Sequence, residues 1–145
     1  MSTTIANNIS FSVIEDATRK VIEMMEGDKK VGSAVLQPKL KLLDMFTVSS
    51  EFRGRGYGRR LWQQVLEEFS NSNVKKFKFQ AVPYEYPESE RLTNPVYKDA
   101  LKNLVDMYKH LGAVEHTPYL LHSDMTMQVP VIQRALKYIT RDKPY

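Results

Sequence analysis

An arginine- and glycine-rich segment, residues 53–60, has the residue types best suited to binding a ligand. Its glycines, Gly54, Gly56 and Gly58, stand at alternate positions with arginines around them. Glycines in a turn tolerate positive φ and leave backbone N–H groups uncovered, and a helix that starts there adds unpaired donors and the positive end of its dipole. Such a turn can hold a pyrophosphate through its backbone, with arginine charge around the anion. The segment therefore predicts an anion-binding turn.

The elements on either side must hold this turn in place. An apolar run from Leu42 to Val48 precedes it and is typical of a strand, and an amphipathic helical pattern over residues 56–70 follows it. Arg-Gly segments also occur in disordered, RNA-binding chains, but a disordered segment is expected to lack apolar neighbours. The turn is therefore predicted to belong to a fold. The apolar residues at helical spacing are Leu61, Trp62, Val65, Leu66 and Phe69.

The spacing of the glycines excludes two common phosphate-binding loops. The segment contains no G-x-x-x-x-G-K-[ST], and its glycines do not follow G-x-G-x-x-G. Residues 53–58 do resemble the R/Q-x-x-G-x-G/A motif of the GNAT superfamily of N-acetyltransferases. A second stretch, residues 104–113, is similar to the family's Leu/Ala-x-x-x-Tyr-x-x-Leu-Gly-Phe segment and contains Tyr108, Leu111 and Gly112. The two segments together favour a GNAT-like protein.

The resemblance implies an acyltransferase that moves an acetyl group from acetyl-CoA to a primary amine, on a protein or a small molecule, without a covalent enzyme intermediate. Two parallel strands splay apart in such a fold, and the free backbone edge of one can hydrogen-bond the amides of a pantetheine arm. A backbone N–H of that edge, near Phe46 or Thr47, could also polarise the thioester carbonyl. The expected cofactor-binding residues are Phe46, Thr47 and Val48 at the edge, and Arg53, Gly54, Arg55, Gly56, Tyr57, Gly58 and Arg59 around the pyrophosphate.

Two side chains are candidates for proton transfer. A tyrosine near the sulfur can protonate the thiolate that the amine expels, and Tyr108 stands at the matching family position. It also lies on the apolar face of its helix, where tyrosines often serve as core residues. Asp44 interrupts the apolar run, so it is expected to be buried and to act as the base for the amine; an edge-exposed or hydrogen-bonded aspartate is the alternative. Glu115 and His116 are weaker substitutes.

Composition limits the class of protein. A chain of 145 residues with 42% hydrophobic content predicts one domain with a core of its own, residues 1–129, closed by an amphipathic tail, residues 130–145. The sequence has no cysteine, and its three histidines make no metal motif, so neither a disulfide nor a metal is expected. An anionic cofactor explains the net charge of +4. The sequence shows no signal-peptide layout and no membrane-length apolar run, which predicts a cytoplasmic protein.

The order of expected elements is four strands, a helix, a strand, a helix and two strands. It indicates a mixed α/β fold with a mostly antiparallel sheet of about seven strands, splayed between its parallel fourth and fifth strands. Residues 15–26 could instead be helical. Asn94 and Pro95 are expected to cap and begin the second helix, and Gly112 to end it. The strands are predicted at residues 9–14, 20–26, 30–36, 39–48, 74–82, 113–121 and 123–129, and the first helix at residues 56–70.

Several features depart from the family pattern. The first two strands are separated by a short segment, so the two helices that often wall the acceptor pocket are missing. The acceptor side is then expected to be open, which favours a protein amine. Leu101 replaces an asparagine that often contacts the cofactor. The acidic and aromatic loop at residues 83–93 is either a lid that attracts a cationic amine or a plain solvated loop.

Two other functions remain open at this stage. The chain could bind CoA or a partner without turnover, or it could bind nucleic acid through its arginine turn and a basic tail. The tail has the same periodicity whether it docks on its own domain or on a second subunit, so a homodimer is also possible. The basic residues of the tail are Arg134, Lys137, Arg141 and Lys143.

Overall fold

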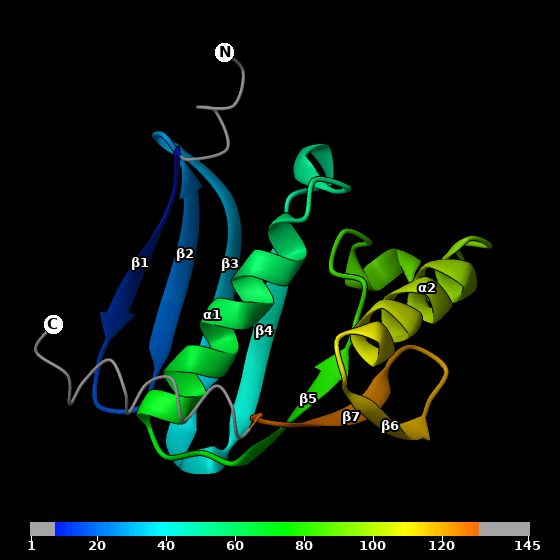
Figure 1. Cartoon of the computed structure of the whole chain (residues 1–145). Coiled ribbons are helices and arrows are strands. Elements are labelled where there is room, and N and C mark those ends of the chain that lie inside the picture. The colour runs from blue at the N-terminus through cyan, green and yellow to red at the C-terminus, as the bar shows by residue number, and fades with distance from the viewer. Residues whose placement is uncertain (1–7, 131–145) are drawn as a thin grey trace, which may run out of the picture.

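One twisted sheet organises the chain. The structure is a computed structural model that describes residues 8–130. Over these residues the sheet has seven strands in the order β1-β2-β3-β4-β5-β7-β6, with two α-helices against it (Figure 1). The mixed fold is as predicted, because only the central pair, β4 and β5, is parallel among these strands. The elements are β1 (Ile9–Glu15), β2 (Lys20–Glu26), β3 (Lys29–Gln37), β4 (Leu42–Val48), α1 (Tyr57–Asn71), β5 (Lys76–Ala81), α2 (Tyr97–His110), β6 (Val114–Pro118) and β7 (Ser123–Gln128).

The first four strands form an antiparallel meander with short connections. Residues of β2 alternate between buried and half-buried positions, so the helical alternative for residues 15–26 is wrong. Gly27 has φ +64° and forms the turn of the predicted β2–β3 hairpin. Between β1 and β2, the Asp16 carboxylate accepts the backbone N–H groups of Thr18 and Arg19 at 2.9 and 2.8 Å. This tight turn leaves no room for helices between the two strands, as expected.

A β-bulge in β4 changes the position of Asp44. The β3–β4 register joins Val35 to Met45 but Leu36 to Leu43, so Asp44 has no partner across the ladder. An extra residue in one strand shifts the alternation of its side chains. Asp44 is exposed, whereas the core-facing residues on both sides of it are buried. The expectation of a buried Asp44 is therefore wrong, because the bulge turns this residue away from the core.

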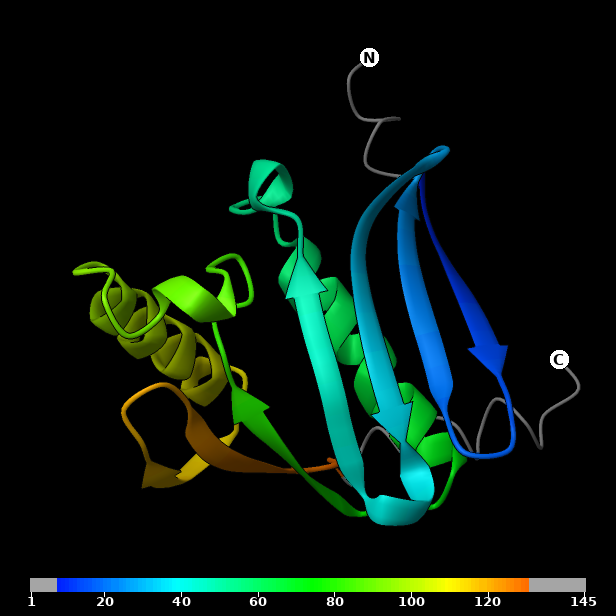
Figure 2. The same cartoon turned by 180° about the vertical axis from the view of Figure 1, so that it is seen from behind.

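The strands β4 and β5 pair only at their base. The predicted start of β4 at residue 39 is too early, because Pro38–Leu40 forms a 3-10 turn and Lys41 has φ +53°. Pairing with β5 is then limited to two matched positions, Leu42 with Lys78 and Leu43 with Phe79. Beyond them the two strands diverge, and Figure 2 shows the widening gap between their ends. The splay therefore begins next to the bulge.

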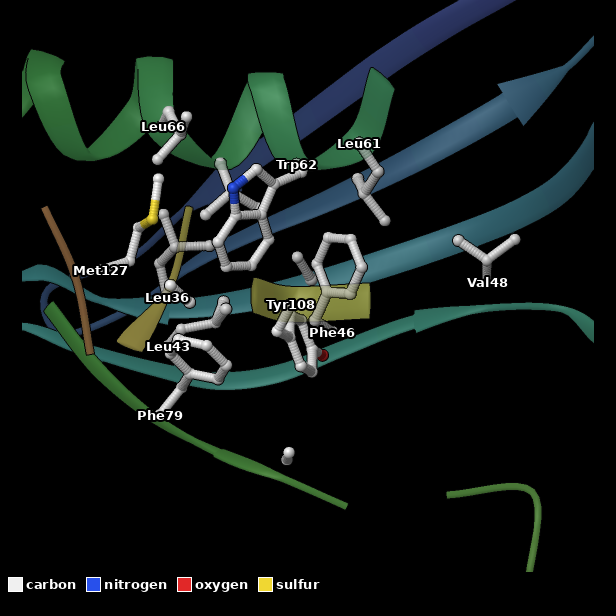
Figure 3. Close-up of a cluster of buried hydrophobic side chains, with 14 of the residues drawn as sticks. Leu36, Leu43, Phe46, Val48, Leu61, Trp62, Leu66, Phe79, Tyr108 and Met127 are labelled. Carbon is white, nitrogen blue, oxygen red and sulfur yellow. The ribbon is translucent and has the colours of Figure 1, made fainter. Parts of the chain in front are cut away.

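Both helices lie on the same face of the sheet (Figures 1 and 2). Trp62 of α1 and Tyr108 of α2 have ring centroids 5.5 Å apart, and both contact Phe46 of β4 and Phe79 of β5. Figure 3 shows these rings inside the apolar layer between the helices and the strands. The core therefore reaches across the splay and holds its two sides together.

The second helix starts slightly later than the sequence suggests. Asn94 accepts the N–H of Val96 through its side chain at 3.0 Å and the N–H of Tyr97 through its carbonyl at 3.1 Å. Asn94 and Pro95 thus form a turn before α2 and not its cap and first turn. Gly112, with φ +104°, follows the helix as predicted.

The last two strands are shorter than predicted. β6 stops at Pro118 and β7 at Gln128, which trims the expected strands over 113–121 and 123–129. The predicted amphipathic tail from residue 131 lies outside the described residues. Within residues 8–130, no helix is long and apolar enough to cross a membrane.

Candidate active site

A cavity of about 480 Å³ occupies the splay between β4 and β5. Its walls come from β4, the Arg-Gly turn, the start of α1, the segment after β5 and one face of α2. Elements from distant parts of the sequence therefore meet at one site. Of the residues expected to bind a cofactor, those in the cavity wall are Phe46, Thr47, Val48, Arg53, Gly54, Gly58 and Arg59.

The edge of β4 is free where it lines this cavity. In the described part of the chain, β4 pairs with β3 as far as Val48, but with β5 only up to Leu43. Its backbone groups on the β5 side beyond Leu43 therefore have no neighbouring strand. Backbone N–H and C=O groups without a sheet partner are the groups that an extended ligand can complete. Phe46, Thr47 and Val48 line the cavity along this edge, where the Val48 carbonyl accepts a hydrogen bond from Arg53.

The Arg-Gly turn leads into an uncapped helix. Gly54 and Gly56 have φ of +81° and +80°, a conformation that favours glycine. Gly56 is the N-cap of α1, and as a glycine it supplies no side-chain cap hydrogen bond. The N–H groups of the first turn therefore have no cap side chain as an acceptor. Together with the positive end of the helix dipole, they face the anion-binding end of the cavity.

Arg55, Gly56 and Tyr57 do not line the cavity. The guanidinium of Arg55 lies over the ring of Phe52, 5.4 Å from its centroid. The Tyr57 hydroxyl donates a hydrogen bond to the Glu26 carboxylate, which raises the pKa of Tyr57. The hydrogen bond to Glu26 fastens the turn to the end of the β2–β3 hairpin. Gly56 shapes the turn, and the other two residues support it from outside.

Tyr108 is almost fully buried but reaches the cavity wall. Its ring packs against Phe79 at 4.8 Å, Trp62 at 5.5 Å and Phe46 at 6.1 Å between centroids (Figure 3). Burial, with a smaller contribution from Tyr84, raises the pKa of the Tyr108 hydroxyl well above its usual range. The hydroxyl is therefore protonated at neutral pH. The structure thus confirms a core position for the ring and places Tyr108 in the cavity wall; its role in proton transfer stays a prediction.

Asp44 lines a different cavity, of about 550 Å³. Residues of β5 alternate between buried positions that face the helices and exposed positions on the other face, and exposed Lys78 and Gln80 line this second cavity together with buried Phe79 between them. The second cavity therefore lies on the face of the sheet opposite the helices. Gln37 donates a hydrogen bond to the Asp44 carboxylate at 3.4 Å. We call the first space the donor cavity and the second the acceptor cavity, after the roles that we propose for them below.

The two substitutes for Asp44 are placed differently. His116 lines the acceptor cavity, where one of its ring nitrogens lies 2.7 Å from the Thr126 hydroxyl. Glu115 lines neither cavity. It accepts a hydrogen bond from the Ser123 hydroxyl and pairs with Lys109 at 3.3 Å, and the Ser123 bond lowers its pKa. Of the two, only His116 is placed to contact a ligand in the acceptor cavity.

Sequence reasoning did not assign the cavity-facing stripe of α2 to the site. Ala100, Asn103, Leu104 and Met107 line the donor cavity beside Tyr108. Their spacing is that of one helix face. Leu101, the residue at the family's asparagine position, is instead a buried core residue. Asn103 is the only polar side chain among these four, and it lies in the interior of the helix, facing the cavity. Its place on that stripe could have identified it as a site residue.

The segment after β5, residues 82–85, forms part of the wall of the donor cavity. Glu85, which lines this cavity, pairs with Arg53 at 3.1 Å. Arg53 also donates through Nε to the carbonyl of Val48 at 3.2 Å. The acidic loop at residues 83–93 is therefore tied to the arginine turn at Glu85, while most of its other residues are exposed.

Structural comparisons show the same fold in acetyltransferases. A GNAT family acetyltransferase from Elizabethkingia anophelis, solved with acetyl-CoA bound, has a TM-score of 0.59 at 11% identity, covering 84% of this chain and 99% of that one. The ribosomal-protein-S18-alanine N-acetyltransferase from Escherichia coli has a TM-score of 0.55 at 15% identity, with coverage of 90% and 78%. Spermidine N-acetyltransferase from Vibrio cholerae has a TM-score of 0.55 at 14% identity, with coverage of 88% and 71%. At these identities the likeness defines the fold class.

The family follows from the sequence itself. Residues 3–87, more than half of the chain, match the model of the acetyltransferase (GNAT) domain. The chain therefore belongs to the GNAT family of acetyltransferases. No protein with a curated description matches the sequence.

Proposed function

We propose that the protein transfers an acetyl group from acetyl-CoA to a primary amine, by direct attack within a ternary complex. The observation that carries this proposal is the donor cavity, where a free strand edge, an uncapped helix N-terminus with an arginine turn, and a protonated tyrosine meet in one splay. Each of these features matches a different part of acetyl-CoA.

The residues of the donor cavity fit the cofactor from end to end. The free edge of β4 at Phe46–Val48 would hydrogen-bond the two amides of the pantetheine arm. The uncapped end of α1 and the backbone of Gly54 and Gly58 would hold the pyrophosphate, with Arg53 and Arg59 adding charge-assisted hydrogen bonds. Arg55, Gly56 and Tyr57 contribute by shaping and supporting this turn.

The reaction needs two proton transfers on opposite sides of the splay. Bound acetyl-CoA supplies a thioester, on which the amine nitrogen forms a C–N bond as the C–S bond breaks. Asp44, on the acceptor side, takes the proton that the amine loses. Tyr108, on the donor side, gives its hydroxyl proton to the departing sulfur. A backbone N–H of β4 near Phe46 or Thr47 stabilises the oxyanion between these two events.

The acceptor proposal follows from the acceptor cavity. It opens on the sheet face that no helix covers within residues 8–130, and Asp44 there has a neutral amide as its side-chain partner. A carboxylate without a basic partner attracts an ammonium group and can hold it until it loses its proton. Because this side is open, we favour a lysine or N-terminal amine of a protein over a small metabolite.

A calorimetric titration with acetyl-CoA tests the donor site. We expect micromolar binding to the intact protein, and a loss of about 100-fold or more in the Arg53→Glu, Gly56→Asp double variant, because one added carboxylate would line the pyrophosphate end of the cavity and the other would stand at the N-terminus of α1. The matched control is Arg19→Glu, Gly27→Asp, which makes the same changes at an exposed arginine and at another positive-φ glycine away from the cavity. Absence of binding to the intact protein would overturn the acetyltransferase proposal; binding without transfer to any amine in a single-turnover panel would favour a non-catalytic CoA-binding module.

Replacing Glu85 by glutamine is expected to tighten the binding of acetyl-CoA about threefold to tenfold. Glu85 holds the Arg53 guanidinium and puts a carboxylate in the wall of a cavity built for a polyanion. The amide removes that charge and releases Arg53 for the pyrophosphate. The effect should shrink as salt is raised, which calorimetry in 50 mM and 500 mM salt measures. Weaker binding in the variant would mean that the ion pair orders the site and does not compete with the ligand.

A further inference from the structure

Tyr84 occupies the junction between the donor and acceptor cavities. It follows β5 by three positions, and it is the one residue shared by the walls of the two cavities over residues 8–130. The family motifs in the sequence do not include it. A molecule bound across both cavities would therefore contact this residue.

The chain around Tyr84 is anchored on both sides. Glu85 pairs with Arg53 across the cavity mouth at 3.1 Å. Tyr86 donates its N–H to the carbonyl of Pro83 at 3.2 Å, and its ring packs edge-on against Tyr97 at 5.6 Å. The carbonyl of Tyr86 also accepts a hydrogen bond from Arg91 at 2.9 Å. These contacts hold the backbone of Tyr84, a residue that is 42% exposed and forms part of both cavity walls.

The electrostatic surroundings of Tyr84 agree with this position. Burial is the main cause of its raised pKa, and the carboxylate of Asp44 adds to it from the acceptor side. Tyr84 in turn contributes to the raised pKa of Tyr108 on the donor side. The Tyr84 side chain thus interacts with the proposed base in one cavity and with the proposed acid in the other.

We propose that the ring of Tyr84 is the partition between the two cavities and a specificity-determining residue of the enzyme. This inference rests on the proposed acetyl transfer. The ring narrows the opening through which the amine reaches the thioester. Of the two protein amines, the unbranched side chain of lysine therefore passes, and an N-terminal amine, which is branched next to the nitrogen, is held back. The same ring shields the thioester from water that enters the open acceptor cavity.

The partition makes a prediction about a side reaction. When the ring is removed, water from the acceptor cavity can attack the thioester carbonyl, and the C–S bond breaks to give acetate and the free thiol of CoA. The reaction needs no other reactant. The rate of acetyl-CoA hydrolysis in the absence of an acceptor amine therefore measures how readily water passes between the cavities.

The experiment compares Tyr84→Ala with Tyr84→Phe and with Tyr119→Ala. Tyr119 is an exposed tyrosine that lines neither cavity, so its truncation is the matched control. We expect Tyr84→Ala to raise acceptor-independent hydrolysis of acetyl-CoA about tenfold. We also expect about a tenfold rise in kcat/KM for an α-branched amine relative to an unbranched one. Tyr84→Phe keeps the ring, so it should restore both values to near those of the intact protein. Calorimetry with acetyl-CoA and thermal unfolding check that each variant keeps its donor site and its fold.

The outcomes separate this inference from the proposed function. If Tyr84→Ala binds acetyl-CoA normally but changes neither hydrolysis nor the ratio between the two amines, the partition is wrong while acetyl transfer stands. If the intact protein acetylates no amine, the proposed function fails, and the hydrolysis comparison still decides whether Tyr84 separates the cavities. If Tyr84→Phe hydrolyses acetyl-CoA as fast as Tyr84→Ala, the hydroxyl and not the ring limits hydrolysis, and the steric proposal is overturned.

Discussion

Replacing Tyr108 by phenylalanine is expected to lower kcat for amine acetylation about 100-fold while the dissociation constant of acetyl-CoA changes by no more than about twofold. The phenyl ring can keep the packing against Phe46, Trp62 and Phe79, so the wall of the donor cavity should stay in place. What the variant loses is the hydroxyl alone. Steady-state kinetics and calorimetry on the same preparation separate the two effects.

The protonation state of Tyr108 supports this expectation. Because burial raises the pKa of its hydroxyl, the folded protein keeps the proton over the whole neutral range, and the group is available as an acid for the departing thiolate. Ionisation of Tyr108 should therefore produce no fall in kcat between pH 7 and pH 9. A variant that kept full kcat would show that Tyr108 is a core residue only.

Tyr97 offers a matched control for this substitution. It is a second buried tyrosine of α2, but it lines neither cavity, and its hydroxyl donates to the carbonyl of Leu121 at 2.6 Å. Tyr97→Phe should cost about 1 kcal/mol of unfolding free energy for the lost hydrogen bond and should leave kcat nearly unchanged. A similar fall in kcat for both variants would point to a general loosening of the helix.

The fold was predictable from local sequence patterns. The alternation of β2, the glycine of the β2–β3 turn and the stripe of apolar residues in α1 each specify an element through its own period or turn chemistry. The match of the Arg-Gly turn and the Tyr108 segment to family motifs then located most of the donor cavity. These signals lie within short stretches of chain, which is why the sequence reveals them.

The acceptor side depended on features that no local pattern carries. The bulge at Asp44 arises from the pairing of β4 with β3, and it moves this carboxylate out of the core and into the second cavity. Tyr84 gains its position because β4 and β5 stop pairing after Leu43. Both positions depend on the register between strands. The sequence therefore indicated Asp44 as a candidate base on β4, but the prediction that it is buried in the core was wrong.

Trp62 is the residue on which the two sides of the splay depend. Its ring contacts Phe46 of β4, Phe77 and Phe79 of β5, and Tyr108 of α2. It is 1% exposed. β4 and β5 share only two matched backbone positions, so much of what holds the diverging strands in place is this aromatic packing and not the ladder.

Trp62→Ala is accordingly expected to lower the free energy of unfolding by about 3–5 kcal/mol, as measured by urea denaturation. The cavity left behind would also remove a neighbour of Tyr108, so kcat should fall in the fraction that stays folded. Trp62→Phe is the sharper control, because the indole Nε1 is buried and has no hydrogen-bond partner among the described residues. Phenylalanine loses part of the ring but no hydrogen bond, so it should cost less than half as much as alanine. An equal loss of unfolding free energy in both variants would contradict this account and would mean that the indole N–H has a partner. A loss below about 1 kcal/mol for Trp62→Ala would mean that the backbone, and not Trp62, keeps the splay open.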